Sequence, residues 1–186
     1  GVSATPYRDT LVDGTAAASL TAIGSDDAVG RLNGSFVADG FELAVAADAA
    51  PEAPIELQAI HGAGQVHVRF PARFGRASKA VVIERHLNAG EEAALVSSVS
   101  DLRIEDGAEI VWIIVQTQGL ADTHLAQIKV ELGADAKFKL FIINAGGKLV
   151  RQEIHVRTAG EGSDFTLRGV NLLGGSQGEF IGAVQR

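Results

Sequence analysis

Five histidines are the side chains in this chain that are best suited to acid–base or metal chemistry: His61, His67, His86, His124 and His155. No two of them have the three-residue separation, near a carboxylate, that is typical of a metal site. Cysteine is absent, which excludes disulfides, thiolate nucleophiles and thiolate metal ligands within the sequence. His124 comes at the start of a predicted strand, and we expect it to be a solvated edge residue rather than a ligand.

His155 and Glu153 lie two residues apart on one predicted strand, so their side chains point to the same face. Such a pair suits acid–base chemistry or half of a metal site, but it is also what an ordinary exposed strand face contains. Arg151 and Arg168 could form an anion-binding pair, although ion pairing with Glu153 or Glu161 is the simpler account. The residues therefore predict no catalytic residue and no metal ligand, and they leave any cofactor-binding residue unidentified.

Glycine-rich stretches and serines give no stronger signal. Residues 160–162 and 174–175 lack the lysine and the following helix that a phosphate-binding loop needs. Ser163 lacks the G-x-S-x-G turn of a nucleophile elbow. We interpret all of these segments as turns. Trp112, Phe138 and Phe141 lie within apolar runs and are predicted to pack in the core.

The elements that would position these residues are short strands. Turn signals recur about every 12 to 17 residues after Gly90, which leaves no room for a helix of average length. Apolar residues alternate over residues 41–46, 66–70, 124–131 and 150–156. Residues 110–115 and 138–143 are apolar on nearly both faces, which indicates strands covered on both sides. Residues 91–102 fit a short helix, but we favour a strand over residues 94–99.

Polar residues fill the alternate positions of these strands, and we expect them to face away from the apolar side: His67, Arg69, Gln127, Lys129, Glu131, Arg151, Glu153 and His155. Two architectures satisfy the pattern, an antiparallel sandwich and a solenoid of stacked coils. Spacing alone does not distinguish them. In either fold, neighbouring strands would bring charged residues together in ladders.

Composition limits the class of protein. The chain has 186 residues, 46% hydrophobic and 21% charged, which is typical of one globular domain. Its net charge of −7 argues against binding to nucleic acid or to an anionic membrane. No apolar run reaches the roughly 20 residues of a membrane span, and no signal peptide is visible, so we expect a cytoplasmic protein. Because the sequence does not begin with Met, we interpret it as a piece of a longer protein.

Three segments carry a family resemblance: GKLVRQEIHV at residues 147–156, AGEG at 159–162 and LRGVNLL at 167–173. Together they resemble the SufB/SufD family of iron–sulfur cluster assembly proteins, and the SufD branch in particular. Leu32-Asn33, Asp39-Gly40 and Pro54-Ile55 occur in the order seen in that family, and the resemblance extends over about residues 30–186.

The resemblance implies a right-handed parallel β-helix over residues 31–186, preceded by a lead-in segment at 1–30 and truncated before the C-terminal part of the family. It also implies a non-catalytic scaffold that acts with a SufB-like subunit and a SufC-like ATPase in the cytoplasm. The iron–sulfur cluster would belong to the assembled complex. We expect no cofactor on this chain itself, because such clusters are usually held by cysteine thiolates. No functional residue is transferred from the family.

Two other functions remain open at this stage. A carbohydrate-active β-helix enzyme would need a groove of charged residues on one sheet, for which the outward residues are the candidates: Lys129, Glu131, Lys137, Lys139, Arg151 and Glu153. A structural all-β module of a larger protein is the third possibility. An exposed edge of the β-helix would also favour a homodimer.

Overall fold

The computed structural model describes residues 1–16, 20, 28–174 and 177–185, and it consists of two facing β-sheets. The first, which we call sheet A, contains β1 (Val2–Pro6), β2 (Asp39–Val45), β4 (Gly64–Arg69), β5 (Ala72–Phe74), β7 (Ala94–Ile104), β9 (Thr123–Leu132), β11 (Leu149–Thr158) and β13 (Gly178–Gln185). The second, sheet B, contains β3 (Ile55–His61), β6 (Lys79–Asn88), β8 (Glu109–Thr117), β10 (Lys137–Asn144) and β12 (Asp164–Asn171).

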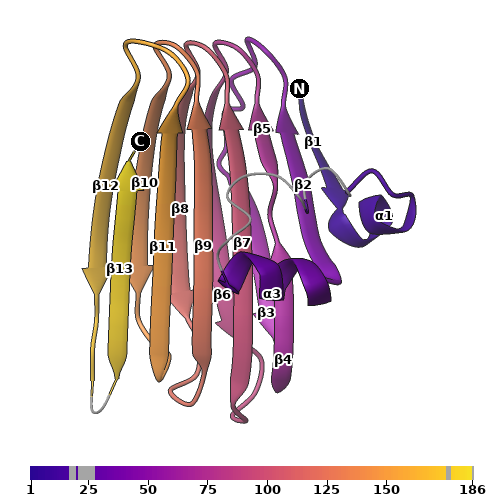
Figure 1. The fold of residues 1–186 in the computed structure, drawn as a ribbon, viewed down its shortest axis with the longest axis vertical. Coiled ribbons are helices and arrows are strands. Elements are labelled where there is room, and N and C mark those ends of the chain that lie inside the picture. Colours follow the sequence, from indigo (N-terminus) through magenta and orange to yellow (C-terminus); the bar gives the residue numbers. More distant parts are fainter. Residues whose placement is uncertain (17–19, 21–27, 175–176, 186) are drawn as a thin grey trace.

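The chain alternates between the two sheets and advances by one strand position each time (Figure 1). Every strand pair in the described chain is parallel except β1 with β2. Parallel neighbours reached through the opposite sheet exclude a sandwich of hairpins and make a solenoid of about five coils. The predicted parallel β-helix is therefore confirmed, and β7 includes the strand favoured over residues 94–99 in place of a helix over 91–102.

One corner of the solenoid has the same construction in every coil. A residue with left-handed backbone conformation recurs every 27 to 30 residues: Asp48, Ala77, Gly107, Asp135 and Gly162. In the first four of these, the N–H donates to a carbonyl of the next coil at 2.8–2.9 Å. The corner thus satisfies its backbone donors between coils and keeps successive coils in register.

Side chains fill the space between the sheets, and they are divided into two zones. At one end, the interior is apolar and contains the fully buried Phe74, Leu102, Ile110, Leu132 and Phe138. At the other end, the inward positions are polar, and the same register continues with side chains such as His, Gln and Asn. Trp112 and Phe138 lie in the core as predicted, whereas Phe141 points to the outer face of sheet B and is half-buried.

In the described part of the chain, helices α1 and α3 flank sheet A, and neither was predicted from the sequence. Helix α1 (Tyr7–Val12) contacts β1 and β2, and helix α3 (Ala28–Phe36) lies on the outer face of β4, β7 and β9 (Figure 1). No helix in the described part of the chain is long and apolar enough to cross a membrane. The position of α3 means that the outer face of sheet A is not open to water where the helix covers it.

Helix α3 corrects the expectation that the polar residues of this face are solvated. Arg69, Gln127 and Lys129 do point away from the core, but they are 1%, 1% and 4% exposed. Arg69 donates to the Asp101 carboxylate at 2.7 and 3.0 Å, so a charged pair is buried beneath the helix. His67 stacks on Phe36 of α3 with a centroid distance of 5.4 Å. The contact with the helix removes these side chains from water without changing their face.

Candidate functional site

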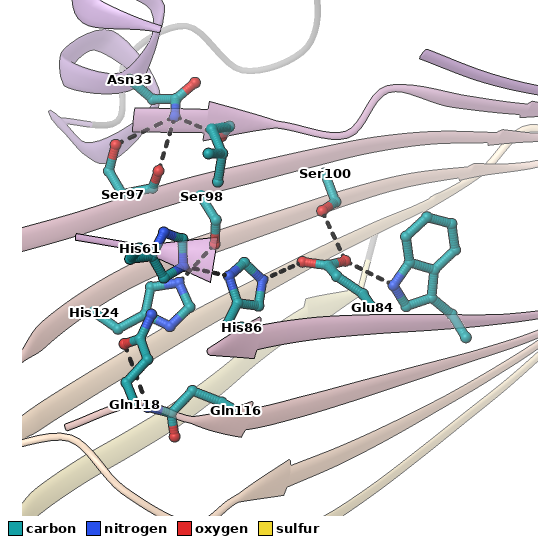
Figure 2. A network of polar contacts seen from close by, with 12 residues as sticks. Asn33, His61, Glu84, His86, Ser97, Ser98, Ser100, Gln116, Gln118 and His124 are labelled. Carbon is teal, nitrogen blue, oxygen red and sulfur yellow. Dashed lines mark hydrogen bonds and ion pairs between the residues drawn. The ribbon is translucent and has the colours of Figure 1, made fainter. Parts of the chain in front are cut away.

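The polar end of the solenoid interior contains a chain of hydrogen-bonded side chains that links three neighbouring strands of sheet B (Figure 2). It runs from His61 on β3 through His86 and Glu84 on β6 to Trp112 on β8. All four are at most 1% exposed. In β6, Ala80 and Val82 precede Glu84 and His86 at the inward positions, so the strand alternation itself places a carboxylate and an imidazole in the core.

Glu84 is the centre of this network. The indole N–H of Trp112 and the hydroxyl of Ser100 donate to its Oε2 at 2.8 and 3.2 Å. Its Oε1 lies 2.6 Å from Nε2 of His86. A buried carboxylate is costly unless donors surround it, and here three donors from strands β6, β7 and β8 do so.

The two histidines lie within hydrogen-bond distance of each other, and His86 also lies within hydrogen-bond distance of Glu84. Nε2 of His61 lies 3.3 Å from Nδ1 of His86, while His86 presents its other nitrogen to Glu84. When His86 donates from Nε2 to the carboxylate, its Nδ1 can accept the N–H of His61. Burial lowers the pKa of His61 to about 4, and the nearby His86 adds to this effect. His61 is therefore neutral at physiological pH.

His124 on β9 faces the same interior space from sheet A. Its ring lies 4.7 Å from that of His86, centroid to centroid, and its Nε2 is 2.8 Å from the hydroxyl of Ser98. It is 0% exposed, so the expectation of a solvated edge residue was wrong. Burial holds the pKa of His124 well below its usual value.

The polar zone continues along the solenoid axis towards the last coil. On β10, Asn144 donates from its amide both to Gln152 on β11 and to Asn171 on β12, each at 3.1 Å. Gln116 occupies the equivalent inward position on β8. A column of polar side chains therefore follows one end of the core from His61 to Asn171.

The first coil opens to solvent beside His61. A cavity of about 280 Å³ is lined by residues of α3, β2, β3 and β4, and His61 forms part of its wall. Nδ1 of His61 has no hydrogen-bond partner. The buried chain of donors and acceptors thus begins next to the open end of the solenoid.

This arrangement can hold and redistribute protons within a water-poor core, but it does not resemble a metal centre. Among the described residues, no group of three or more His, Asp or Glu side chains has the geometry to hold a metal ion. Three histidines are close in space, yet His86 uses both of its ring nitrogens within the network. The chemistry that the site supports is hydrogen bonding and proton sharing.

The structure places the two pairs singled out from the sequence, His155 with Glu153 and Arg151 with Arg168, on outer faces and not in the interior site. Arg151 forms an ion pair with Glu153, as the simpler account proposed, and His155 is half-buried on the same face. Arg168 belongs to the opposite sheet, so it forms no anion-binding pair with Arg151.

The charged residues proposed for a catalytic groove are also separated. Lys137 and Lys139 are on sheet B, whereas the other four are on sheet A, and Lys129 is buried near α3. These residues therefore do not line one groove, and no observation favours the carbohydrate-active enzyme.

The sequence signal for the interior site was partly present. His124 lies on the same face of its strand as Ala126, Ile128 and Val130, which were predicted to face one side together. Strand β6 gives no such signal, because Val81 and Ile83 are apolar on its outer face as well. Either face of β6 could have been taken as inward.

Comparison with known proteins identifies the family. The model of the SUF system FeS cluster assembly, SufBD core domain, matches residues 58–182. A comparison with curated proteins found no match. The matched residues extend from β3 into β13 and so include the coils that carry the interior polar column. The chain therefore belongs to the SufBD core domain family of the SUF system for iron–sulfur cluster assembly.

Proposed function

We propose that this chain is the solenoid core of a SufD-like scaffold subunit, which acts with a SufB-like subunit and a SufC-like ATPase and catalyses no reaction by itself. The observation that carries the proposal is the family match over residues 58–182, which covers two thirds of the chain and nearly all of its coils. The cytoplasm is the compartment in which we expect this assembly to work.

The absence of cysteine from residues 1–186 leans towards a SufD-like role. Iron–sulfur clusters are cargo for such an assembly, and they are usually held by thiolates. Any thiolate ligand would therefore lie outside these residues. The contribution of the chain would then be to position its partners.

We propose a homodimer through an exposed edge of the β-helix as the alternative to the complex with the SufB-like subunit and the SufC-like ATPase. An unpaired strand edge is a template on which another strand can add.

Co-expression tests the proposal directly. The complete gene product would be co-expressed with its cognate SufC-like and SufB-like proteins and analysed by size-exclusion chromatography with light scattering. We expect a ternary complex, and each partner expressed alone with the gene product serves as the control. A protein that elutes alone in the presence of both partners would overturn the assembly role, whereas a dimer of this protein alone would identify the homodimer.

A further inference from the structure

The outer face of sheet B is apolar, although no helix in the described part of the chain packs on it. Helix α3 contacts strands of sheet A, and α1 contacts β1 and β2. Seven residues form the apolar centre, which we call the sheet B face: Val81, Ile83, Val111, Ile113, Val115, Phe141 and Ile143. They alternate with buried core residues such as Trp112 and therefore point outwards.

The register makes this face continuous. Ile83, Ile113 and Phe141 are aligned partners on three adjacent strands, and Val115 and Ile143 are aligned in the next outward row. Three strands at a spacing of about 4.8 Å give a strip about 10 Å wide, which matches the diameter of an α-helix. Water-facing sides of β-sheets are normally polar, so a strip of this kind marks a docking surface.

Lysines outnumber carboxylates at one end of the strip. One outward row contains Lys79, Glu109, Lys137 and Asp164 on adjacent strands, and Lys139 lies in the next outward row of β10. The distances from the Glu109 carboxylate to the Nζ atoms of Lys79 and Lys137 are 3.2 and 3.8 Å. Lys79, Lys137 and Lys139 are three of the five lysines in a chain with a net charge of −7. A groove of about 260 Å³ lies at this end, between the lysines and Val111.

We propose that the sheet B face binds an amphipathic helix of a partner protein, whose apolar side is flanked by carboxylates. Apolar residues at i, i+3, i+4 and i+7 of such a helix would cover the strip, and its acidic flank would meet the lysines. The opposite sheet already shows that a helix fits on the outer face of this solenoid, because α3 occupies that position.

Charge argues against the other two occupants. In a face-to-face dimer whose two-fold axis runs along the strands, the lysines at this end would lie against the same lysines of the second copy, and like charges disfavour that contact. An anionic membrane would attract the lysines but repel the rest of a protein with net charge −7. This inference concerns a sheet face and is tested with peptides, whereas the proposed function depends on the family match and is tested by complex formation, so the two can fail separately.

The test uses two fluorescently labelled 18-residue helical peptides that carry leucines on one side. One has flanking glutamates and the other has flanking lysines in the same positions. Binding to the chain would be measured by fluorescence anisotropy at low ionic strength and again at 0.5 M salt. We expect the glutamate peptide to bind at least tenfold more tightly than the lysine peptide, and the difference to shrink in high salt because the charges are exposed.

Three variants locate the binding site. Ile113→Glu, at the centre of the strip, and Lys137→Glu, at its basic border, should each weaken binding of the glutamate peptide at least tenfold. Leu120→Glu, which changes an exposed leucine at a turn outside the strip, should leave binding unchanged. Circular dichroism and the urea midpoint would show that all three variants fold.

Several results would overturn the proposal. Equal binding of the two peptides, or unchanged binding to Ile113→Glu, would show that the strip does not select an acidic helix. Concentration-dependent dimers that Ile113→Glu abolishes would assign the face to a second copy. Co-sedimentation with phosphatidylserine vesicles that the same variant abolishes would assign it to a membrane.

Discussion

Replacement of Glu84 by leucine is the sharpest test of the interior polar network. The substitution leaves three buried donors without their acceptor: the Trp112 indole, the Ser100 hydroxyl and the His86 ring. Each unsatisfied buried group costs about 1–3 kcal/mol, and part of this is offset because a buried carboxylate no longer has to be desolvated. We expect Glu84→Leu to lower the free energy of unfolding by about 3 kcal/mol.

A conservative variant separates hydrogen bonding from charge. Glu84→Gln keeps an oxygen that can accept from Trp112 and Ser100, and its amide can donate to His86 in the other tautomer. Glu84→Gln should lower the free energy of unfolding by about 1 kcal/mol, which is the difference between a charge-assisted hydrogen bond and a neutral one. Glu109→Gln, on the exposed face of β8, is the matched control and should change stability by less than about 0.5 kcal/mol.

The assay is urea unfolding followed by fluorescence and by circular dichroism. Trp112 is the single tryptophan and contacts Glu84 directly, so its emission reports both on the network and on the unfolding of the central coils. With a urea dependence of about 3 kcal/mol per molar, Glu84→Leu should lower the midpoint by about 1 M. If its midpoint lies within the error of the wild type, the network contributes no net stability and our reasoning is refuted.

Three further predictions concern pH, a glycine and a buried ion pair. The pKa of His61 is about 4 in the folded state and 6.5 when the side chain is exposed, so between these values the unfolded state binds the extra proton. Acidification from pH 6.5 to 4 should therefore lower the free energy of unfolding by up to about 3 kcal/mol. His61→Gln should flatten the dependence of the urea midpoint on pH. Burial raises the pKa of Asp101, so this carboxyl alone would stabilise the fold as pH falls, and it opposes part of the loss. Gly40→Ala should destabilise the protein by at least about 3 kcal/mol in thermal melts, because the added Cβ would lie 1.8 Å from the Arg69 carbonyl oxygen. Gly107→Ala, whose Cβ would lie in open space at φ +67°, should cost only about 1 kcal/mol of stability. Similar melting temperatures for the two variants would contradict this prediction. Arg69→Met should lower the free energy of unfolding by about 3–5 kcal/mol, because the buried Asp101 carboxylate loses its arginine partner and keeps only the nearby Lys129. The added change Asp101→Leu should restore at least half of this loss in a double-mutant cycle, and a purely additive result would contradict the coupling.

Seven of the strands, β2, β4 and β7 to β11, could be predicted from the sequence, because most of them have two clearly different faces or a continuous apolar run. The coil architecture could not, because alternation within a strand is the same for a hairpin and for a parallel coil. Only the resemblance over residues 147–173 predicted the solenoid. The helix over residues 28–36 was missed because it contains Gly30 and Gly34, which weaken the helical signal.

Those two glycines also explain why burial of the polar face was missed. A Cβ on Gly30 would lie 2.9 Å from Oε1 of Gln127, so the helix backbone comes close to the side chains of sheet A. Burial of Arg69 and Lys129 depends on this contact between segments far apart in the sequence. Strand periodicity predicts the direction of a side chain, but it does not predict what covers it.

The repeated corner makes the length of the protein adjustable in whole coils. The first four left-handed residues are each bonded to the coil that follows, and the strands of each sheet pair through the same kind of backbone ladder. A duplication or deletion of about 28 residues between two corners would join equivalent backbone positions, so both sheets and both interior zones would remain aligned. A deletion of one residue within a strand would instead exchange its inner and outer faces. Evolution can therefore change the length of the solenoid in steps of one strand spacing, about 4.8 Å, while keeping the fold.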